Sequence, residues 1–530
     1  MKNIVLKLII IVTIITLGSC KKFLQTEPVD FFAPSTYYQT KDHLDFALAG
    51  VYDRLGMNRL YGAYMHTLHN MEADEGFYSV QASVVGVYRY NFSVSDPDIL
   101  WFWRSIYEGV GRANALLANV DNNKIIAESY RNRVRGEALF LRAYYYFLLV
   151  QNFENIPVYL KPISNHEEVD IPATPAKEVY EQIITDMETA EGLVDPIEKI
   201  GFGGRVSKSA VRGILARVCL NMAGEPVKDV SKYEKARFWA KKVMDDFGAG
   251  HKLNPDYSDI FIKYARDEYD IKESIWEVEH YGANTDANSE GGYVGSWIGI
   301  RNSSTTNDIG YSLGRINSTA KHYRIYEPGD LRRDWNIAPF SYNASGGKVP
   351  FAENQLYNRN AGKYRREYQT FRPNSGQPTP INFPLLRYAD VLLMYAEAEN
   401  EINGAGRDPK ALEAINMVRR RGFGKLMPGA TDVDANDLPQ GIAKHTFFRS
   451  IIDERSKELC YEVLRRADLI RWGIFVETMK ETLVQMNVDL GPEAWQSLTF
   501  KNASQRHVIY PIPSYELGLN KALKQHPLWR

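Results

Sequence analysis

A strongly apolar stretch, RGEALFLRAYYYFLLVQNFENIPV, occupies residues 135–158. Arg142 is the only charged residue between positions 138 and 150, and neither glycine nor proline interrupts that run. Its composition favours a helix, and a helix that is apolar on nearly every side must be enclosed by other helices or by lipid. The run is shorter than the roughly 20 residues that span a bilayer. We therefore predict the central helix of a large α-domain, with tyrosines 144–146 in the core and an end before Pro157.

Apolar residues at helical spacing recur elsewhere in the chain. They predict helices at 35–55 with Ser35 as a cap, and at 98–120, 174–193, 207–224, 233–248, 385–404, 411–424 and 447–472. The segments 207–224 and 233–248 form one predicted hairpin, and 385–404 with 411–424 form another. Hairpins with small residues at the crossing are typical of tetratricopeptide-type repeats, which bury their faces by stacking. The sequence therefore predicts an all-α fold.

Two smaller features refine this picture of the helices. Trp101 and Trp103 lie in the segment 98–120, and we expect both to pack that helix rather than bind a ligand. The segment 447–472 mixes both charge signs at three- and four-residue steps, so we expect ion pairs within its own helix. Its charged residues are Glu454, Arg455, Glu458, Glu462, Arg465 and Arg466.

Helical spacing is absent from 58–95 and from about 254–384. Both stretches are rich in glycine and aromatic residues, and the second also in asparagine, serine and threonine. A long irregular stretch inside a globular chain is usually functional, and rigid helices that carry variable loops are a common binding architecture. We therefore expect the ligand-facing region at about 254–384.

The N-terminus has the features of an export signal. Lys2 and Lys7 precede an apolar run that ends in Leu17-Gly18-Ser19-Cys20. A charged start, an apolar core and small residues before a cut site indicate a secretory signal, and the final four residues resemble the lipobox of bacterial lipoproteins. That resemblance implies a signal peptide at 1–19, lipidation of Cys20, a tether at 20–34 and a single folded domain at 35–530. Attached acyl chains would anchor the protein to a membrane.

Charge and cysteine usage exclude some classes of protein. The 530 residues carry a formal net charge of −1, which gives no basic footprint for nucleic acid. Besides Cys20 the cysteines are Cys219 and Cys460, each in an apolar helical pattern. We interpret them as buried free thiols, although the sequence leaves a disulfide between them open.

No catalytic or metal motif is convincing. His66 and His69 are one turn apart but lack the glutamate of the zinc-protease motif. A calcium-loop imitation begins at Asp432 but has Asp437 where glycine is needed and Ala443 where glutamate is needed. We therefore predict no catalytic residue, no metal and no cofactor. The two carboxyl groups of a glycosidase are recognised by their distance in space, which a sequence does not show. A surface glycosidase therefore stays an alternative.

The aromatic loops give a better signal for function. A sugar ring has an apolar C–H face and a rim of hydroxyls, so exposed aromatic rings with nearby polar side chains can bind it. We predict ligand contacts from two groups of residues. They are Asp74, Glu75, Phe77 and Tyr78 in the first loop region, and Tyr293, Trp297, Arg301, Asn302 and Tyr311 in the second.

Several stretches together resemble the SusD/RagB family of Bacteroidetes outer-membrane lipoproteins. They are the lipobox followed by KKFL, then GEALFLRAYYYFLLVQNFENIPV, FPLLRYADVLLMYAEAENEI, ERSKELCYEVLRRADLIRWG and the tail PIPSYELGLNKALKQHPLW. The tail departs from the family pattern at His526-Pro527-Leu528, where Asn-Pro-Gly is usual. Val463-Leu464 stands where the family usually has a glycine, and we expect only a local change in packing there.

The resemblance implies four tetratricopeptide-like helix pairs wrapped on one side by loops. It implies a non-enzymatic cell-surface protein that captures oligosaccharides or other nutrients. Its partner would be a TonB-dependent outer-membrane channel of the SusC type. Capture of peptides, as in RagB-like proteins, is the main alternative, and a scaffold built on helical repeats is another.

Overall fold

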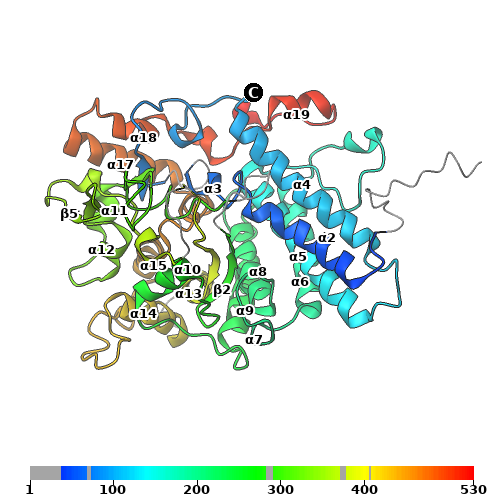
Figure 1. Cartoon of the computed structure of the whole chain (residues 1–530), viewed down its shortest axis with the longest axis horizontal. Coiled ribbons are helices and arrows are strands. Elements are labelled where there is room, and N and C mark those ends of the chain that lie inside the picture. The colour runs from blue at the N-terminus through cyan, green and yellow to red at the C-terminus, as the bar shows by residue number, and fades with distance from the viewer. Residues whose placement is uncertain (1–36, 68–72, 282–290, 371–375, 377, 405–407) are drawn as a thin grey trace, which may run out of the picture.

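The computed structural model describes residues 37–67, 73–281, 291–370, 376, 378–404 and 408–530. The predicted signal segment, Cys20 with its tether, Ser35 and His69 lie outside these ranges. The long helices of the described chain pack as consecutive pairs (Figure 1). The pairs are α2 (Lys41–Gly56) with α4 (Pro97–Asn119), α5 (Glu128–Phe153) with α6 (Ala176–Leu193), α8 (Lys208–Ala223) with α9 (Lys232–Met244), and α13 (Tyr388–Asn403) with α14 (Pro409–Gly422). Neighbouring pairs also touch, so the predicted all-α stack of hairpins is confirmed.

Helix α5 lies in the middle of one half of the stack, between α4 and α6 (Figure 1). Every side chain from 140 to 150 is buried, as predicted. The three consecutive tyrosines each have a partner for the hydroxyl group. Tyr144 Oη lies 2.6 Å from Tyr61 Oη, Tyr145 Oη donates to Val51 O at 2.6 Å, and Tyr146 Oη donates to Tyr159 O at 2.7 Å. These tyrosines are core residues with satisfied polar tips.

The helix starts follow local capping chemistry. Ser207 caps α8, with its hydroxyl accepting from Ala210 N at 3.2 Å. Asp96 caps α4, and Pro97 takes the first helical position. Helix α2 begins at Lys41, with Thr40 as the cap.

The predicted helix at 385–404 is partly wrong. Residues Phe383–Arg387 form strand β6, which pairs antiparallel with β2 (Ser274–Val278), and α13 begins only at Tyr388. Every residue of both strands is buried. A short apolar run enclosed on both faces has no alternation, so periodicity cannot separate strand from helix there.

The predicted helix at 447–472 is two helices, α15 (Lys444–Leu459) and α16 (Arg465–Arg471). The chain breaks between them, where Tyr461 and Val463 adopt left-handed φ values of 61° and 62°. The expected pairing within the helix is also largely wrong, because most partners of these charged side chains lie on other elements.

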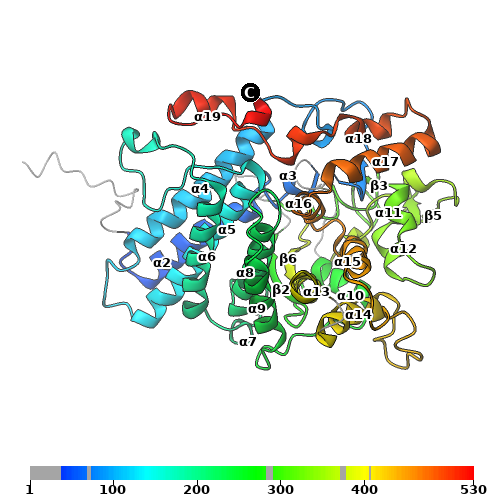
Figure 2. The ribbon, with the colours of Figure 1, turned by 180° about the vertical axis from the view of Figure 1, so that it is seen from behind.

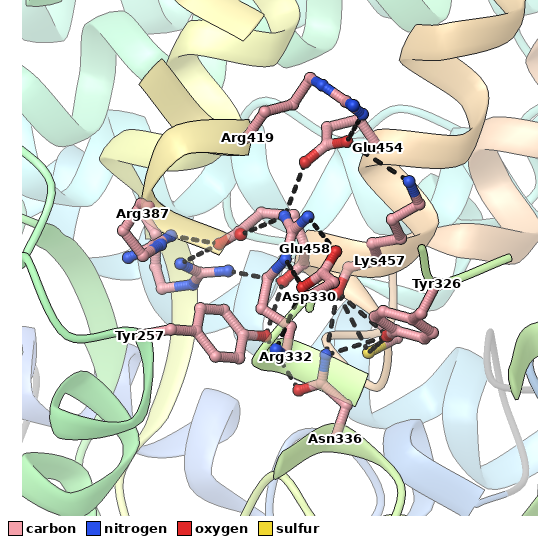
Figure 3. Close-up of polar contacts among 12 residues, drawn as sticks. Tyr257, Tyr326, Asp330, Arg332, Asn336, Arg387, Arg419, Glu454, Lys457 and Glu458 are labelled. Atoms are coloured by element: carbon pink, nitrogen blue, oxygen red, sulfur yellow. Dashed lines mark hydrogen bonds and ion pairs between the residues drawn. The ribbon is translucent and has the colours of Figure 1, made fainter. Parts of the chain in front are cut away.

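Glu458 of α15 shows where those charges go (Figure 3). Its carboxylate accepts from Arg332 at 3.2 Å, from Arg387 at 2.9 Å and from Arg421 at 2.6 Å. All four side chains are fully buried. Burial alone would raise the pKa of Glu458, but the three guanidinium groups outweigh it and lower the pKa to about 2. Glu458 therefore joins α15 to α12 (Arg332–Asn336), β6 and α14.

The predicted irregular region contains short elements held by such contacts. They are α10 (Tyr257–Arg266), β3 (Ile316–Ser318), α11 (Ala320–Arg324), α12 (Arg332–Asn336) and the hairpin of β4 (Phe340–Tyr342) with β5 (Lys348–Pro350). Figure 2 shows α17 (Phe475–Leu490) beside α16 and α11, which it contacts. The remaining short elements are α3 (Tyr64–Thr67), β1 (Gly76–Tyr78), α7 (Ile197–Ile200), α18 (Leu498–Asn502) and α19 (Ser514–Leu519). In the described ranges, none of the helices combines the length and apolar character that crossing a membrane requires.

Candidate functional site

The first loop region reaches the second through a two-stranded sheet. Strand β1 pairs antiparallel with β3, with Tyr78 opposite Ile316. Successive side chains of a strand point to opposite faces. Phe77 is accordingly buried, with its ring centroid 6.0 Å from that of Trp495, whereas Tyr78 is half-buried. The sheet brings Tyr78 close to Arg315, which directly precedes β3.

Backbone hydrogen bonds fix the segment around Trp297. Tyr293 N donates to Gly62 O at 2.7 Å, and Trp297 N donates to Tyr293 O at 2.8 Å. Arg315 N donates to Trp297 O at 2.7 Å. Two loop regions far apart in sequence are thereby held together at one place.

Six half-buried side chains meet there, and we call them the aromatic platform: Tyr64, Tyr78, Tyr88, Tyr293, Trp297 and Arg315. The ring centroid of Trp297 lies 5.7 Å from that of Tyr64 and 5.2 Å from that of Tyr293. Tyr78 stacks on Tyr88 with centroids 4.3 Å apart. These separations are those of favourable aromatic pairs, which hold rigid contact surfaces in place.

Arg315 joins the two groups of rings. Its guanidinium carbon lies 5.8 Å from the ring centroid of Trp297 and 5.9 Å from that of Tyr78, within cation–π range. At the other end of the platform, Arg59 lies over Tyr64 at 4.4 Å and over Trp101 at 5.9 Å. The arrangement offers flat apolar faces with guanidinium donors between them, which suits the faces and hydroxyls of sugars.

The acidic pair predicted to contact ligand does not belong to this surface. Asp74 and Glu75 are buried. Arg465 donates to both Asp74 oxygens, at 2.8 and 2.9 Å. Burial opposes ionisation of Asp74, but Arg465, with Lys321, outweighs it and lowers the pKa of the carboxyl. Burial raises the pKa of Glu75 to about 8, with Arg465 opposing the shift. Both carboxyl groups are therefore part of the buried interior and not of the ligand-facing surface.

The other predicted contacts divide between interior and surface. Phe77 is a core residue, and Asn302 is buried, with its amide donating to Gly310 O at 2.8 Å. Arg301 is exposed and Tyr311 is half-buried. Among the described residues the ring of Tyr311 has no aromatic partner, so the structure does not join it to the platform. Of the nine predicted ligand residues, Tyr78, Tyr293 and Trp297 come together.

Several residues of this surface have no distinguishing signal in the sequence. Tyr64, Tyr88 and Arg315 lie within the two loop regions and carried no pattern that separated them from other loop residues. Trp101 was expected to pack its helix, but 48% of its surface is exposed, whereas Trp103 is buried as expected. Trp101 and Trp103 are two positions apart on α4 and therefore lie on different faces. Only the contacts with Arg59 show which tryptophan adjoins the platform.

A cavity of about 730 Å³ lies elsewhere, between α4, residues 157–170 and α19. It is lined by aromatic side chains such as Trp103 and Tyr107. Several polar groups at this cavity already bond to one another. Tyr107 Oη donates to Pro157 O at 2.8 Å, and Arg104 Nε donates to Glu516 at 2.6 Å. The aromatic platform, where the side chain of Arg315 has no such partner within the described part of the chain, is therefore the stronger candidate for a polar ligand.

Contacts that resemble catalytic groups are enclosed in the interior. Ser456 Oγ lies 3.3 Å from His322 Nδ1 and 3.1 Å from Glu75 Oε1, and all three side chains are buried. Burial lowers the pKa of His322 to about 3. Within the described ranges, no group of three or more histidine, cysteine, aspartate or glutamate side chains could hold a metal. His66 is buried and bonds through Nε2 to Tyr61 O.

Cys219 and Cys460 are both free and buried, so the interpretation as thiols is confirmed. Burial raises the pKa of each thiol to about 12. Neither is a candidate nucleophile, because the reactive form is the thiolate.

Two family profiles match the chain. One is described as the SusD family and matches residues 272–529, and the other is described as starch-binding associating with outer membrane and matches residues 22–220. The chain belongs to the SusD/RagB family. Tyr293, Trp297 and Arg315 of the platform lie within the match to the SusD family profile. Tyr64, Tyr78 and Tyr88 lie within the match to the starch-binding profile.

Known family members align along most of the chain. A SusD-like protein P2 from Formosa agariphila is 27% identical, and the alignment covers 98% of each chain. The starch-binding protein SusD from Bacteroides thetaiotaomicron is 24% identical over 77% of this chain and 75% of its own. The crystal structure of a SusD homolog from Bacteroides thetaiotaomicron superposes with a TM-score of 0.86 at 27% identity, covering 94% of this chain and 98% of the other.

Proposed function

We propose that this SusD/RagB family member is a non-enzymatic cell-surface lipoprotein. It binds oligosaccharides at the aromatic platform and delivers them to a TonB-dependent outer-membrane channel. The observation that carries the proposal is the platform itself. Half-buried rings from both loop regions are held by backbone hydrogen bonds, with Arg315 between them. The starch-binding name of the SusD relative supports the same class of ligand.

The geometry suits capture rather than conversion. A sugar ring laid on Trp297 gains apolar contact, while guanidinium groups nearby can donate to its hydroxyls. Because the backbone already fixes the rings, little conformational entropy is lost on binding. Such a site requires neither a nucleophile nor a carboxyl group of shifted pKa.

Membrane attachment and delivery rest on sequence and family. Cys20 follows Leu-Gly-Ser at the end of an apolar run, which supports cleavage and lipidation at that residue. Membership in the SusD/RagB family supports a channel of the SusC type as partner. Mass spectrometry of the purified N-terminal peptide tests the first point, with acyl chains expected on Cys20 and absent from a Cys20→Ala variant. Copurification of a channel with the tagged full-length protein tests the second.

Calorimetry with the detergent-solubilised full-length protein and a panel of oligosaccharides and peptides tests the binding function. We expect oligosaccharide binding, and Trp297→Ala should weaken it at least about ten-fold, the equivalent of about 1.4 kcal/mol. The melting temperature should fall little. Tyr515→Ala, which removes an aromatic side chain that is 56% exposed on α19, is the matched control and should bind normally.

Other results would lead to different functions. Binding of peptides alone would favour the peptide-capture alternative. Release of shorter products from a bound glycan over a day would identify a glycosidase. Normal oligosaccharide binding by Trp297→Ala would remove the platform from the proposed site.

A further inference from the structure

The positive charge of Arg315 has no counter-charge in the described chain. Its side chain makes no ion pair or hydrogen bond with a described residue, and its Nε is buried without a partner. The two terminal nitrogens are not among the buried unpartnered atoms. The guanidinium group thus lies between Trp297 and Tyr78 with its donors unused. Buried or half-buried arginines elsewhere in this protein generally have a carboxylate partner, as Arg332, Arg387 and Arg465 do.

A second arginine adds to the positive field at the same place. The guanidinium carbon of Arg89 lies 5.9 Å from the ring of Tyr78, on which Arg315 also rests. Arg89 is fully buried and donates to the carbonyl oxygens of Ser83, Tyr78 and Val80. These acceptors are neutral, so none of the described residues compensates the charge of Arg89 either. Burial lowers its pKa only to about 10, which leaves it cationic at neutral pH.

The two carboxyl groups that directly precede β1 have other cations as their partners. Asp74 is used by Arg465 and Lys321, and Arg465 also lies 4.0 Å from Glu75. The charged groups that act on Tyr78 are the two arginines, which oppose the rise in its pKa caused by burial. Two cations that have no counter-ion among the described residues attract anions to the aromatic rings beside them, because a guanidinium fork matches the oxygens of carboxylate and sulfate.

We propose that the aromatic platform selects glycans that carry an anionic group, with Arg315 binding the carboxylate of a uronic acid or the sulfate of a sulfate ester. The inference rests on the proposed glycan-binding function and specifies its ligand class. The sugar ring adjoining the charged group lies on Trp297 or Tyr78. Arg89 contributes through its charge, since its donors are already used within the protein.

Matched ligand pairs test the charge alone. One pair is an oligogalacturonide and its methyl ester, and the other is a carrageenan oligosaccharide and its desulfated form. Binding to the full-length protein is measured by calorimetry at about 50 mM and about 500 mM salt. We expect the charged member of at least one pair to bind about ten-fold or more tightly than its neutral counterpart, since charge-assisted hydrogen bonds are the strong ones. Salt should reduce that preference, because it screens exposed charges.

Variants assign the preference to Arg315. Arg315→Gln should abolish it, and Arg315→Lys should keep part of it, because lysine retains the charge but not the planar fork. Lys410→Gln removes one exposed positive charge on α14 and is the control for net charge. Melting temperatures should stay close to that of the parent, since the Arg315 side chain makes no hydrogen bond or ion pair with the described protein. A preference in the carboxylate pair identifies uronic acids, and one in the sulfate pair identifies sulfate esters.

Equal binding of charged and neutral members, or a preference that survives in Arg315→Gln, overturns the anionic ligand class. If neutral oligosaccharides still bind and Trp297→Ala weakens them, the glycan-binding function stands without it. If no oligosaccharide binds under any condition, both proposals fail.

Discussion

Asp74 and Arg465 are 391 positions apart in the chain, yet two hydrogen bonds of 2.8 and 2.9 Å join them in the interior. The pair connects the first loop region, just before β1, to the start of α16. Isolated in the sequence, Asp74 looked like a residue that could bind the hydroxyls of a ligand. The structure shows instead that it neutralises a buried arginine.

Asp74→Asn should lower stability by about 3 kcal/mol, because it leaves Arg465 buried without its anion. Thermal and urea unfolding measure the loss, and glycan affinity below the transition should not change. The double variant Asp74→Asn/Arg465→Met should recover part of the stability, since replacing both charges removes the unpaired ion. Full stability of the single variant would show that the pair contributes nothing.

Glu75 should make stability depend on pH in the opposite sense from most carboxyl groups. Its folded-state pKa is raised from 4.5 to about 8, so the native state binds more protons than the unfolded state between those values. Its contribution is complete below pH 4.5 and is lost as pH rises through 8. Glu75→Gln, which mimics the protonated form, should become progressively more stable than the parent between pH 5 and 8, by roughly 4 kcal/mol.

Melting temperatures of both proteins across that range test the prediction for Glu75. Asp74 does not affect this comparison. Its pKa is lowered, so its contribution to the free energy of unfolding changes only in acid. A constant difference between the two proteins from pH 5 to 8 would contradict the raised pKa.

Phe77 and Tyr78 are neighbours on β1, but substitutions at Phe77 should reduce stability, whereas substitution of Tyr78 should reduce ligand affinity. Phe77→Ala should cost about 3 kcal/mol of stability through the cavity it leaves, with Phe77→Leu losing less if the alanine variant does not fold. Tyr78→Ala should melt close to the parent but lose oligosaccharide affinity. Calorimetry and thermal unfolding of both variants separate the roles. The assignment is wrong if Phe77→Leu weakens binding more than Tyr78→Ala does.

At Val463 a glycine substitution should be less destabilising than an alanine substitution, the reverse of the usual order. It is a buried β-branched residue with a left-handed φ of 62°, a conformation that costs L-residues about 1–2 kcal/mol. The departure from the family's usual glycine therefore concerns the backbone as well as packing. Both Val463→Ala and Val463→Gly remove the side-chain contacts, but only glycine relieves the strain.

We expect Val463→Gly to be more stable than Val463→Ala by about 1 kcal/mol in urea unfolding. An unstrained site such as Val218, buried in the middle of α8, provides the comparison. There glycine should be the less stable of the two substitutions. The same order at both positions would show that the strain at Val463 is negligible.

Local sequence patterns predicted the helices well. The apolar run of α5 has no possible solvent-facing side, and the pattern of α8 begins at a capping serine, so each helix follows from residues within a few turns. The family motifs extended this prediction to the four helix pairs. Periodicity failed at β6, because a strand buried on both faces has no alternation. It failed again between α15 and α16, where Tyr461 and Val463 turn the chain despite good helix formers on either side.

The sequence by itself determined that aromatic loops are mounted on a helical stack, because both features are local in composition and spacing. It could not determine which loop residues form a surface. Tyr64, Tyr78 and Trp297 meet through the pairing of β1 with β3 and through hydrogen bonds between segments more than 200 positions apart. The same long-range contacts enclose Asp74 and Glu75 and leave Arg315 without a counter-charge among the residues that the structure describes. Only the tertiary structure decides such matters, because burial and charge pairing depend on which distant residues become neighbours.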